Sequence, residues 1–157
     1  MKKVCFFSCC LGVLSFANSF NTNVYVGATA GKIDKHNYSQ FGIGYTANKR
    51  FDNNILMGFG NSIYYGEVKS NKSATTVDMD LKVGYEIIQD LRAYAIGSGA
   101  VQYYDNSTYT GLGYGASLEY RITPKFAVEG TYKTMNMRKS NHSYDYDSAN
   151  LAFKVGF

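Results

Sequence analysis

The sequence predicts an all-β protein, an eight-stranded antiparallel up-and-down transmembrane β-barrel. Three features of its 157 residues point to this fold class. Short segments alternate apolar and polar side chains, polar turns separate these segments, and the chain ends on the aromatic residue Phe157. A barrel strand exposes only every second side chain to lipid, so the pattern needs no long apolar run.

The closing strand shows the alternation most clearly. Its apolar face holds Ala149, Leu151, Phe153, Val155 and Phe157, and the residues between them are small or polar. A strand with one apolar face that ends the chain on an aromatic ring is typical of the last strand of a membrane barrel.

Seven earlier segments repeat this pattern. They cover residues 24–33, 38–47, 55–66, 77–86, 92–104, 112–122 and 126–133. Asn61 is an exception on the apolar face of its strand, and the segment 92–104 is so rich in Ala and Gly that its lipid-facing side is left open. The chain is long enough for eight strands of about 9–11 residues, the length that crosses a bilayer when tilted.

The connections predict the orientation. We expect tight turns after the second, fourth and sixth strands and longer polar loops at 67–74 and 138–144, with both termini at the short-turn, periplasmic rim. Aromatic girdles are expected at both rims. The inner girdle would contain Phe51, Tyr85, Tyr120, Phe126 and Phe157. The outer girdle would contain Tyr38, Tyr65, Tyr103, Tyr104, Tyr109, Tyr144 and Tyr146.

The amino-terminal segment predicts export. Lys2 and Lys3 precede an apolar run at 4–16, and Ser15 and Ala17 form a small-residue cleavage site. We therefore expect a cleaved signal peptide at 1–17 and one barrel domain at 18–157, with cleavage after Ser19 as the alternative.

The composition of the mature chain excludes several kinds of site. All three cysteines lie within residues 1–17, so disulfides and thiolate chemistry are not expected. His36 and His142 lack companions at metal-ligand spacing, and we expect no metal and no cofactor. Without Lys2 and Lys3 the chain has 14 basic and 12 acidic residues, a net charge of +2 that does not favour nucleic acid as a partner.

The polar faces predict a layer of charge inside the barrel. Lys82, Glu119, Glu129 and Lys154 lie at similar distances from the expected inner rim, where opposite charges would pair. Since an eight-stranded barrel is only just filled by its side chains, we expect this layer to close the lumen. The alternative is a switchable plug that admits small ions, which would make the protein a narrow pore.

Together these features resemble the small eight-stranded outer-membrane barrels of the OmpA/OmpX type. The resemblance implies a structural protein of the outer membrane of a Gram-negative-type envelope, surrounded by outer-membrane lipids and lipopolysaccharide. It also implies that Phe153, Val155 and Phe157 form a signal for the barrel-assembly machinery. Envelope integrity, adhesion and interaction with host surface factors are the roles that the family suggests. We expect a monomer.

Two further functions compete with a purely structural role. The cationic residues Lys69, Lys72, Arg138, Lys139 and His142 fall in the expected outer loops. They predict a surface that binds lipopolysaccharide or acidic host polymers, as an adhesin would.

The second alternative is a lipid A-modifying enzyme. His142 and Ser143, with Asp145 and Asp147 nearby, are its only candidate catalytic residues. Neighbouring side chains on an extended strand point to opposite faces, which separates this His from this Ser. We therefore do not expect an enzyme.

Overall fold

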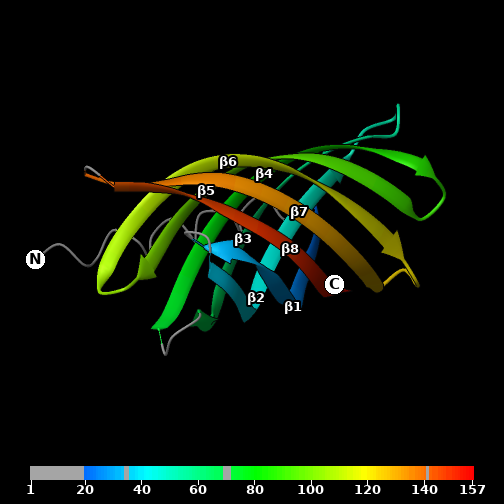
Figure 1. Ribbon diagram of the computed structural model, residues 1–157. Helices are drawn as coiled ribbons and strands as arrows, with labels where there is room; N and C mark the ends of the chain where they lie inside the picture. Colours follow the sequence, from blue (N-terminus) through cyan, green and yellow to red (C-terminus); the bar gives the residue numbers. More distant parts are fainter. Residues whose placement is uncertain (1–19, 34–35, 69–71, 141) are drawn as a thin grey trace, which may run out of the picture.

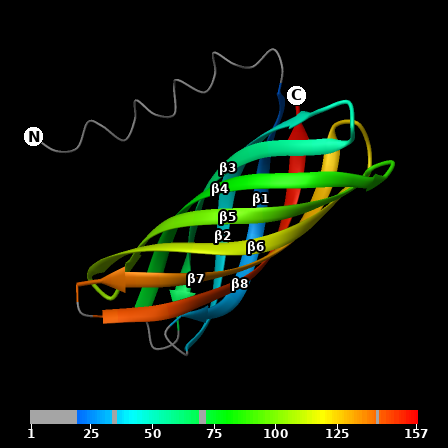
Figure 2. The same cartoon turned by 90° about the horizontal axis from the view of Figure 1, so that it is seen from above.

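A computed structural model describes residues 20–33, 36–68, 72–140 and 142–157, and there the chain forms a closed antiparallel barrel with its eight strands in sequence order. The predicted signal peptide lies outside the described residues. The strands are β1 (Asn21–Ile33), β2 (His36–Arg50), β3 (Ile55–Val68), β4 (Lys72–Ile88), β5 (Leu91–Tyr104), β6 (Ser107–Arg121), β7 (Phe126–Lys139) and β8 (His142–Gly156). Figures 1 and 2 show the tilted strands wrapping around one interior. The predicted fold class is confirmed.

The barrel closes through a long ladder between β1 and β8. It runs from Asn23, opposite Gly156, to Ile33, opposite Tyr146. Closure leaves no free sheet edge, which is the condition for a sheet to lie in lipid. We call the rim where β1 begins and β8 ends the inner rim, and the opposite one the outer rim.

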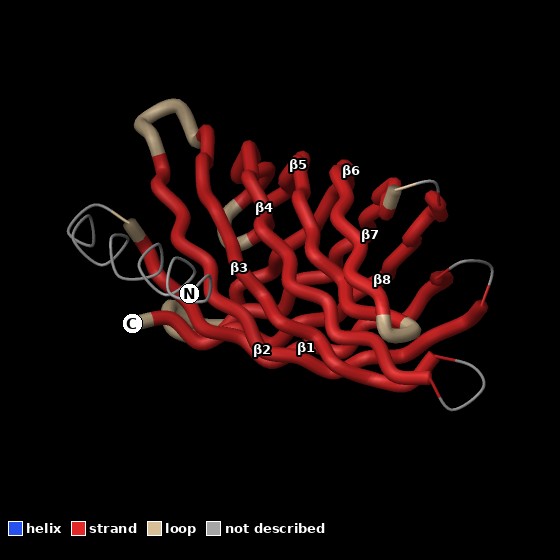
Figure 3. The backbone as a smooth tube through the Cα atoms, turned by 90° about the vertical axis from the view of Figure 1, so that its left-hand side faces the viewer, coloured by secondary structure: helices blue, strands red, loops and turns tan. Residues whose placement is uncertain are grey.

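The prediction of long outer loops is wrong. The segments 67–74 and 138–144 are mostly strand: β3 continues to Val68, β4 begins at Lys72, β7 reaches Lys139 and β8 begins at His142. At the outer end of the β5–β6 hairpin only Asp105 and Asn106 lie between the strands, both with positive φ. Two such residues form the tight turn whose twist matches paired strands. Figure 3 shows the described connections, in tan, as short segments between long strands.

The outward face is apolar, as the alternation predicts. Leu112, Leu81 and Phe41 are each more than 70% exposed, which suits contact with lipid. The structure also resolves the facing of β5, where Arg92 and Tyr94 are buried in the interior and small residues face outward.

The girdle prediction holds at the inner rim and fails at the outer rim. Phe51, Tyr85, Tyr120, Phe126 and Phe157 are all exposed. Of the seven tyrosines expected at the outer rim, Tyr65 and Tyr103 are exposed, and the remaining five are buried: Tyr38, Tyr104, Tyr109, Tyr144 and Tyr146. The five lie on the inward-facing side of their strands, so their rings fill the barrel instead of anchoring it.

Candidate functional site: the lumen and the outer rim

The inner half of the lumen holds a continuous chain of ion pairs. We call this group the inner ion layer. It consists of Arg50, Glu86, Arg92, Glu119, Lys154, Glu129 and Lys82. All of them except Arg50 are buried, and Arg50 lies at the inner rim with about half of its side chain exposed.

The four residues that the sequence placed in one layer meet in the structure. Lys82 Nζ lies 2.5 Å from Glu129 Oε1, and Lys154 Nζ lies 2.6 Å from Glu119 Oε2. Lys154 also pairs with Glu129. The strand register brings these side chains together, because Glu119 lies directly opposite Glu129 across β6 and β7. Lys154 supplies the positive charge that keeps these two carboxylates together.

The sequence did not predict the remainder of this layer. Arg92 Nη1 lies 3.1 Å from Glu119 Oε1, and Arg50 Nη1 lies 2.9 Å from Glu86 Oε2. Arg92 was missed because the facing of its strand was open. The opposite charges of Glu86 and Arg92 were one available signal for this pairing, since the two residues lie opposite each other across the β4–β5 hairpin.

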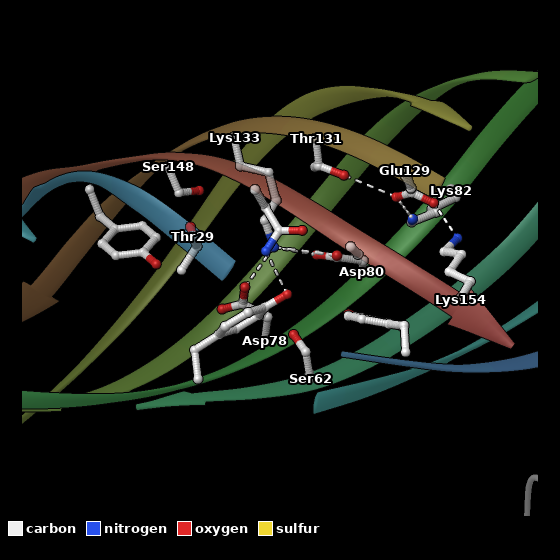
Figure 4. A pocket seen from close by; sticks show the side chains of 15 residues that line it. Thr29, Ser62, Asp78, Asp80, Lys82, Glu129, Thr131, Lys133, Ser148 and Lys154 are labelled. Carbon is white, nitrogen blue, oxygen red and sulfur yellow. Dashed lines mark hydrogen bonds and ion pairs between the residues drawn. The ribbon is translucent and has the colours of Figure 1, made fainter. Parts of the chain in front are cut away.

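A second group of charges lies above the inner ion layer. Lys133 Nζ is 2.6 Å from Asp78 Oδ2 and 3.2 Å from Asp80 Oδ1. Figure 4 shows Lys133 reaching down between the two carboxylates. A cavity of about 20 Å³ borders this group. That volume accommodates about one water molecule.

The two charged groups balance each other. Within the described chain they contain five carboxylates, Asp78, Asp80, Glu86, Glu119 and Glu129. They also contain five cations, Arg50, Lys82, Arg92, Lys133 and Lys154. Charges removed from water are tolerated when they are paired and hydrogen-bonded, so this equality suits a buried network.

Neutral hydrogen-bonding side chains follow toward the outer rim. Gln40 Nε2 donates to the Ala74 carbonyl at 2.9 Å, and Gln102 Nε2 donates to Thr76 Oγ1 at 2.7 Å. The Tyr144 hydroxyl donates to Gln102. These contacts connect β2, β4, β5 and β8 across the interior.

An apolar plug fills the outer end of the lumen. The Tyr38 and Tyr146 rings stack with centroids 5.3 Å apart, and Tyr109 meets Tyr144 edge to face at 4.8 Å. The plug consists of Ile33, Tyr38, Val68, Ala74, Ala100, Tyr104, Tyr109, Met135, Met137, Tyr144 and Tyr146. The sequence did not predict it, because its tyrosines had been assigned to the outer girdle.

Two of the expected surface-binding residues, Lys72 and Lys139, lie beside the β5–β6 turn. Lys72 Nζ lies 2.7 Å from Asp105 Oδ2, and Lys139 Nζ donates to Ser107 Oγ at 2.6 Å. These two contacts place Lys72 and Lys139 on the two sides of the turn.

Other members of the expected surface-binding set have neighbours of their own. Arg138 Nε donates to Asn136 Oδ1 at 2.6 Å. The His142 ring lies 6.2 Å from that of Tyr109. Lys69 lies outside the described residues.

The expected assembly signal lies on the outward face at the inner rim. Phe157 is 77% exposed, and Phe153 stacks on Phe126 with centroids 5.8 Å apart. Val155, between Phe153 and Phe157 in sequence, is half-buried. The outward aromatic surface of β8 therefore continues onto β7.

These observations define the class of protein: a closed transmembrane β-barrel. The family model of the outer membrane protein β-barrel domain matches residues 4–157, and the chain belongs to this family. The protein is accordingly a bacterial outer-membrane protein. No curated protein matches this chain.

Solved structures share the fold. Neisserial surface protein A has a TM-score of 0.59 at 16% identity, covering 88% of this chain and 97% of that one. Ail of Yersinia pestis has a TM-score of 0.56 at 14% identity, covering 88% and 100%. The amino-terminal barrel of Pseudomonas aeruginosa OprF has a TM-score of 0.53 at 16% identity, covering 88% and 100%.

Proposed function

We propose that this protein is a structural, non-conducting barrel of the outer membrane, with a closed polar lumen and an outer rim available for interactions. The observation that supports this proposal best is the succession of layers in the lumen. Ion pairs, amides and an apolar plug follow one another from the inner rim to the outer rim. An ion crossing the barrel would have to displace all three.

Energetics favour a closed state. Separating Lys82 from Glu129 or Lys154 from Glu119 would leave buried charges without partners. Removing one member of a buried pair typically costs about 3–5 kcal/mol. Opening the outer end would also expose the apolar plug to water. The switchable-plug alternative requires both changes at once.

Planar-bilayer recording tests this proposal. The purified protein should give no stepped currents, whereas a 16-stranded porin prepared in the same detergent should give them. A Tyr38→Ala/Tyr146→Ala variant, which removes two rings of the apolar plug, should be recorded in the same experiment. Stepped currents from the unaltered protein would replace the structural barrel with the narrow pore.

The proposal contains no catalytic step. His142 and Ser143 are neighbours at the start of β8, where successive side chains point to opposite faces. Lipid A from cells with and without the protein should have the same mass spectrum. A mass change that disappears in a His142→Ala variant would restore the enzyme alternative.

Surface binding is a second candidate function, and the arrangement around the β5–β6 turn favours it. Lys72 and Lys139 are exposed on either side of that turn, and Arg138 is exposed beside Lys139. The structurally similar Ail has been solved with sucrose octasulfate, a heparin analogue. We extend this to an anionic polymer at the outer rim, either lipopolysaccharide or a host surface polysaccharide.

Charge reversal tests the binding candidate. An Arg138→Glu/Lys139→Glu variant should bind sulfated polysaccharide or lipopolysaccharide more weakly, and the loss should shrink at high salt. A Lys49→Glu variant near the inner rim is the matched control, because it changes charge at the opposite end of the barrel. Equal binding by all three proteins would remove this candidate.

A further inference from the structure

One carboxylate oxygen in the lumen is buried without a hydrogen-bond donor. Asp78 is only 2% exposed, and its Oδ2 lies 2.6 Å from Lys133 Nζ. Its other oxygen, Oδ1, accepts no hydrogen bond from the described residues. An acceptor that is removed from water and left unpaired destabilises the fold, and buried polar atoms are therefore almost always hydrogen-bonded. Asp78 Oδ1 requires a donor that its neighbours do not supply.

Lys133 does not supply this donor. A lysine ammonium has three N–H groups. Lys133 Nζ donates to Asp78 Oδ2 at 2.6 Å and to Asp80 Oδ1 and Oδ2 at 3.2 and 3.3 Å, so three contacts already occupy it. The neighbouring ammonium groups, those of Lys82 and Lys154, bind the carboxylates of the inner ion layer.

A second unpaired atom borders the same space. Ser148 is 3% exposed, lies opposite Lys133 across β7 and β8, and makes no hydrogen bond through Oγ within the described chain. Ser148 and Asp78 both line the cavity of about 20 Å³, as does Ser62, which lies opposite Asp78 across β3 and β4. Figure 4 shows these three side chains around the cavity. A carboxylate oxygen and a hydroxyl that share one cavity can share one small partner.

The size and charge of the cavity indicate what this partner is. A buried water requires about 10–15 Å³ and two to four polar partners, and the cavity meets both conditions. The charged side chains that line it comprise three carboxylates and three ammonium groups, Asp78, Asp80, Glu129, Lys82, Lys133 and Lys154. Because these charges balance, the lining offers no net charge to attract an ion. A neutral molecule that both donates and accepts hydrogen bonds fits best.

We infer that this cavity is a binding site for a single structural water. The water donates to Asp78 Oδ1 and exchanges a hydrogen bond with Ser148 Oγ, and the Ser62 hydroxyl is within the same cavity as a third partner. The direct ion pair between Asp78 and Lys133 joins β4 to β7, whereas the water joins β4 to β8, the strand that closes the barrel. This inference goes beyond the proposed function and does not depend on whether the lumen conducts.

A crystal structure of the full barrel, at a resolution that shows ordered water, tests the site directly. We expect one density peak within about 3 Å of both Asp78 Oδ1 and Ser148 Oγ. Ser148→Val, which removes the hydroxyl and places a methyl group in the cavity, should abolish the peak. An empty cavity in the unaltered protein would overturn the inference, as would a direct hydrogen bond between Asp78 and Ser148. A peak surrounded by five or six oxygens at about 2.4 Å would replace the water with a cation.

Urea titration in lipid vesicles tests whether the water stabilises the barrel. Ser148→Ala removes one partner of the water and should lower the unfolding midpoint. Ser117→Ala is the matched control, because Ser117 is also buried, its Oγ also lacks a partner in the described part of the chain, and it does not line this cavity. Removing that unpaired hydroxyl should leave the midpoint unchanged or raise it. Equal shifts in the two variants would overturn the water-mediated link between β4 and β8.

Discussion

Lys82 and Glu129 come from strands on different sides of the barrel, 47 residues apart in sequence, and their side chains meet at 2.5 Å in the lumen. Glu129 also pairs with Lys154 and accepts a hydrogen bond from Thr131 at 3.0 Å. This one carboxylate therefore joins β4, β7 and β8 through the interior.

Replacing Glu129 should destabilise the barrel strongly. Glu129→Leu leaves Lys82 and Lys154 with one buried partner fewer, and we expect a loss of about 3–5 kcal/mol in the free energy of unfolding. Urea titration of the protein refolded into lipid vesicles measures this loss. A Lys82→Met/Glu129→Leu double variant should lose less than the sum of the single losses, because the pair is removed together. Additive losses would mean that the pair is not coupled.

The apolar plug should depend on Tyr146. This ring is 1% exposed and stacks on Tyr38, so Tyr146→Ala should lower the free energy of unfolding by about 3–5 kcal/mol. Tyr103→Ala removes a ring that is 51% exposed and should cost much less in the same urea titration. Equal losses at the two positions would contradict the assignment of Tyr146 to the interior.

Two glycines should differ in how well they tolerate an added methyl group. A Cβ on Gly113 would lie 2.2 Å from the Thr134 carbonyl oxygen, whereas a Cβ on Gly97 would meet nothing within 4 Å. Gly113→Ala should therefore cost about 1–3 kcal/mol, the usual range for overpacking. Gly97→Ala should be close to neutral. Unfolding midpoints of the refolded variants provide the comparison, and a neutral Gly113→Ala would contradict the close approach of β6 and β7.

Removal of Phe157 should impair assembly more than stability. The ring is 77% exposed, so its loss removes few interior contacts. We expect a lower yield of folded protein in the outer membrane but an unfolding midpoint close to that of the unaltered barrel after refolding in vitro. Phe153→Ala and Val155→Ala should lower the yield in the same way. An unaffected yield would remove the proposed assembly signal.

Folded barrel in the outer-membrane fraction should show heat-modifiable mobility. Unheated and boiled samples should run at different positions on a gel, since a closed sheet with buried ion pairs binds less detergent than an unfolded chain. The Tyr146→Ala variant should convert at a lower temperature. A single position for the unaltered protein under both conditions would contradict a stably closed barrel.

The alternation of side chains carried most of the information about the fold. It specified strand number, the lipid-facing side and the height of charged residues, which is why the sequence alone groups Lys82 and Glu119 with Glu129 and Lys154. Alternation does not predict the lipid-facing side of a strand whose two faces carry similar side chains. Along β5 the small residues gave no contrast between an apolar and a polar face. The lipid-facing side of this strand therefore stayed open, and Arg92 was not assigned to the inner ion layer.

Strand ends and aromatic roles required the tertiary structure. Polar residues near Lys72 and Lys139 are compatible with a loop or with a strand that continues beyond the lipid, and backbone pairing decides between them. A tyrosine near a rim is equally suited to the membrane interface or to the interior. Tyr65 and Tyr146 differ only in which side of the sheet their position faces.

The ion pairs of Lys154 constrain the register in which β8 pairs with its neighbours. A shift of β8 by one residue would turn its apolar face inward and be rejected by the side-chain pattern alone. A shift by two residues would preserve that pattern, yet it would move Lys154 by about 6.6 Å along the neighbouring strand. Glu119 and Glu129 would then face each other without the cation between them. The buried charges thus discriminate between alignments that hydrophobicity cannot distinguish.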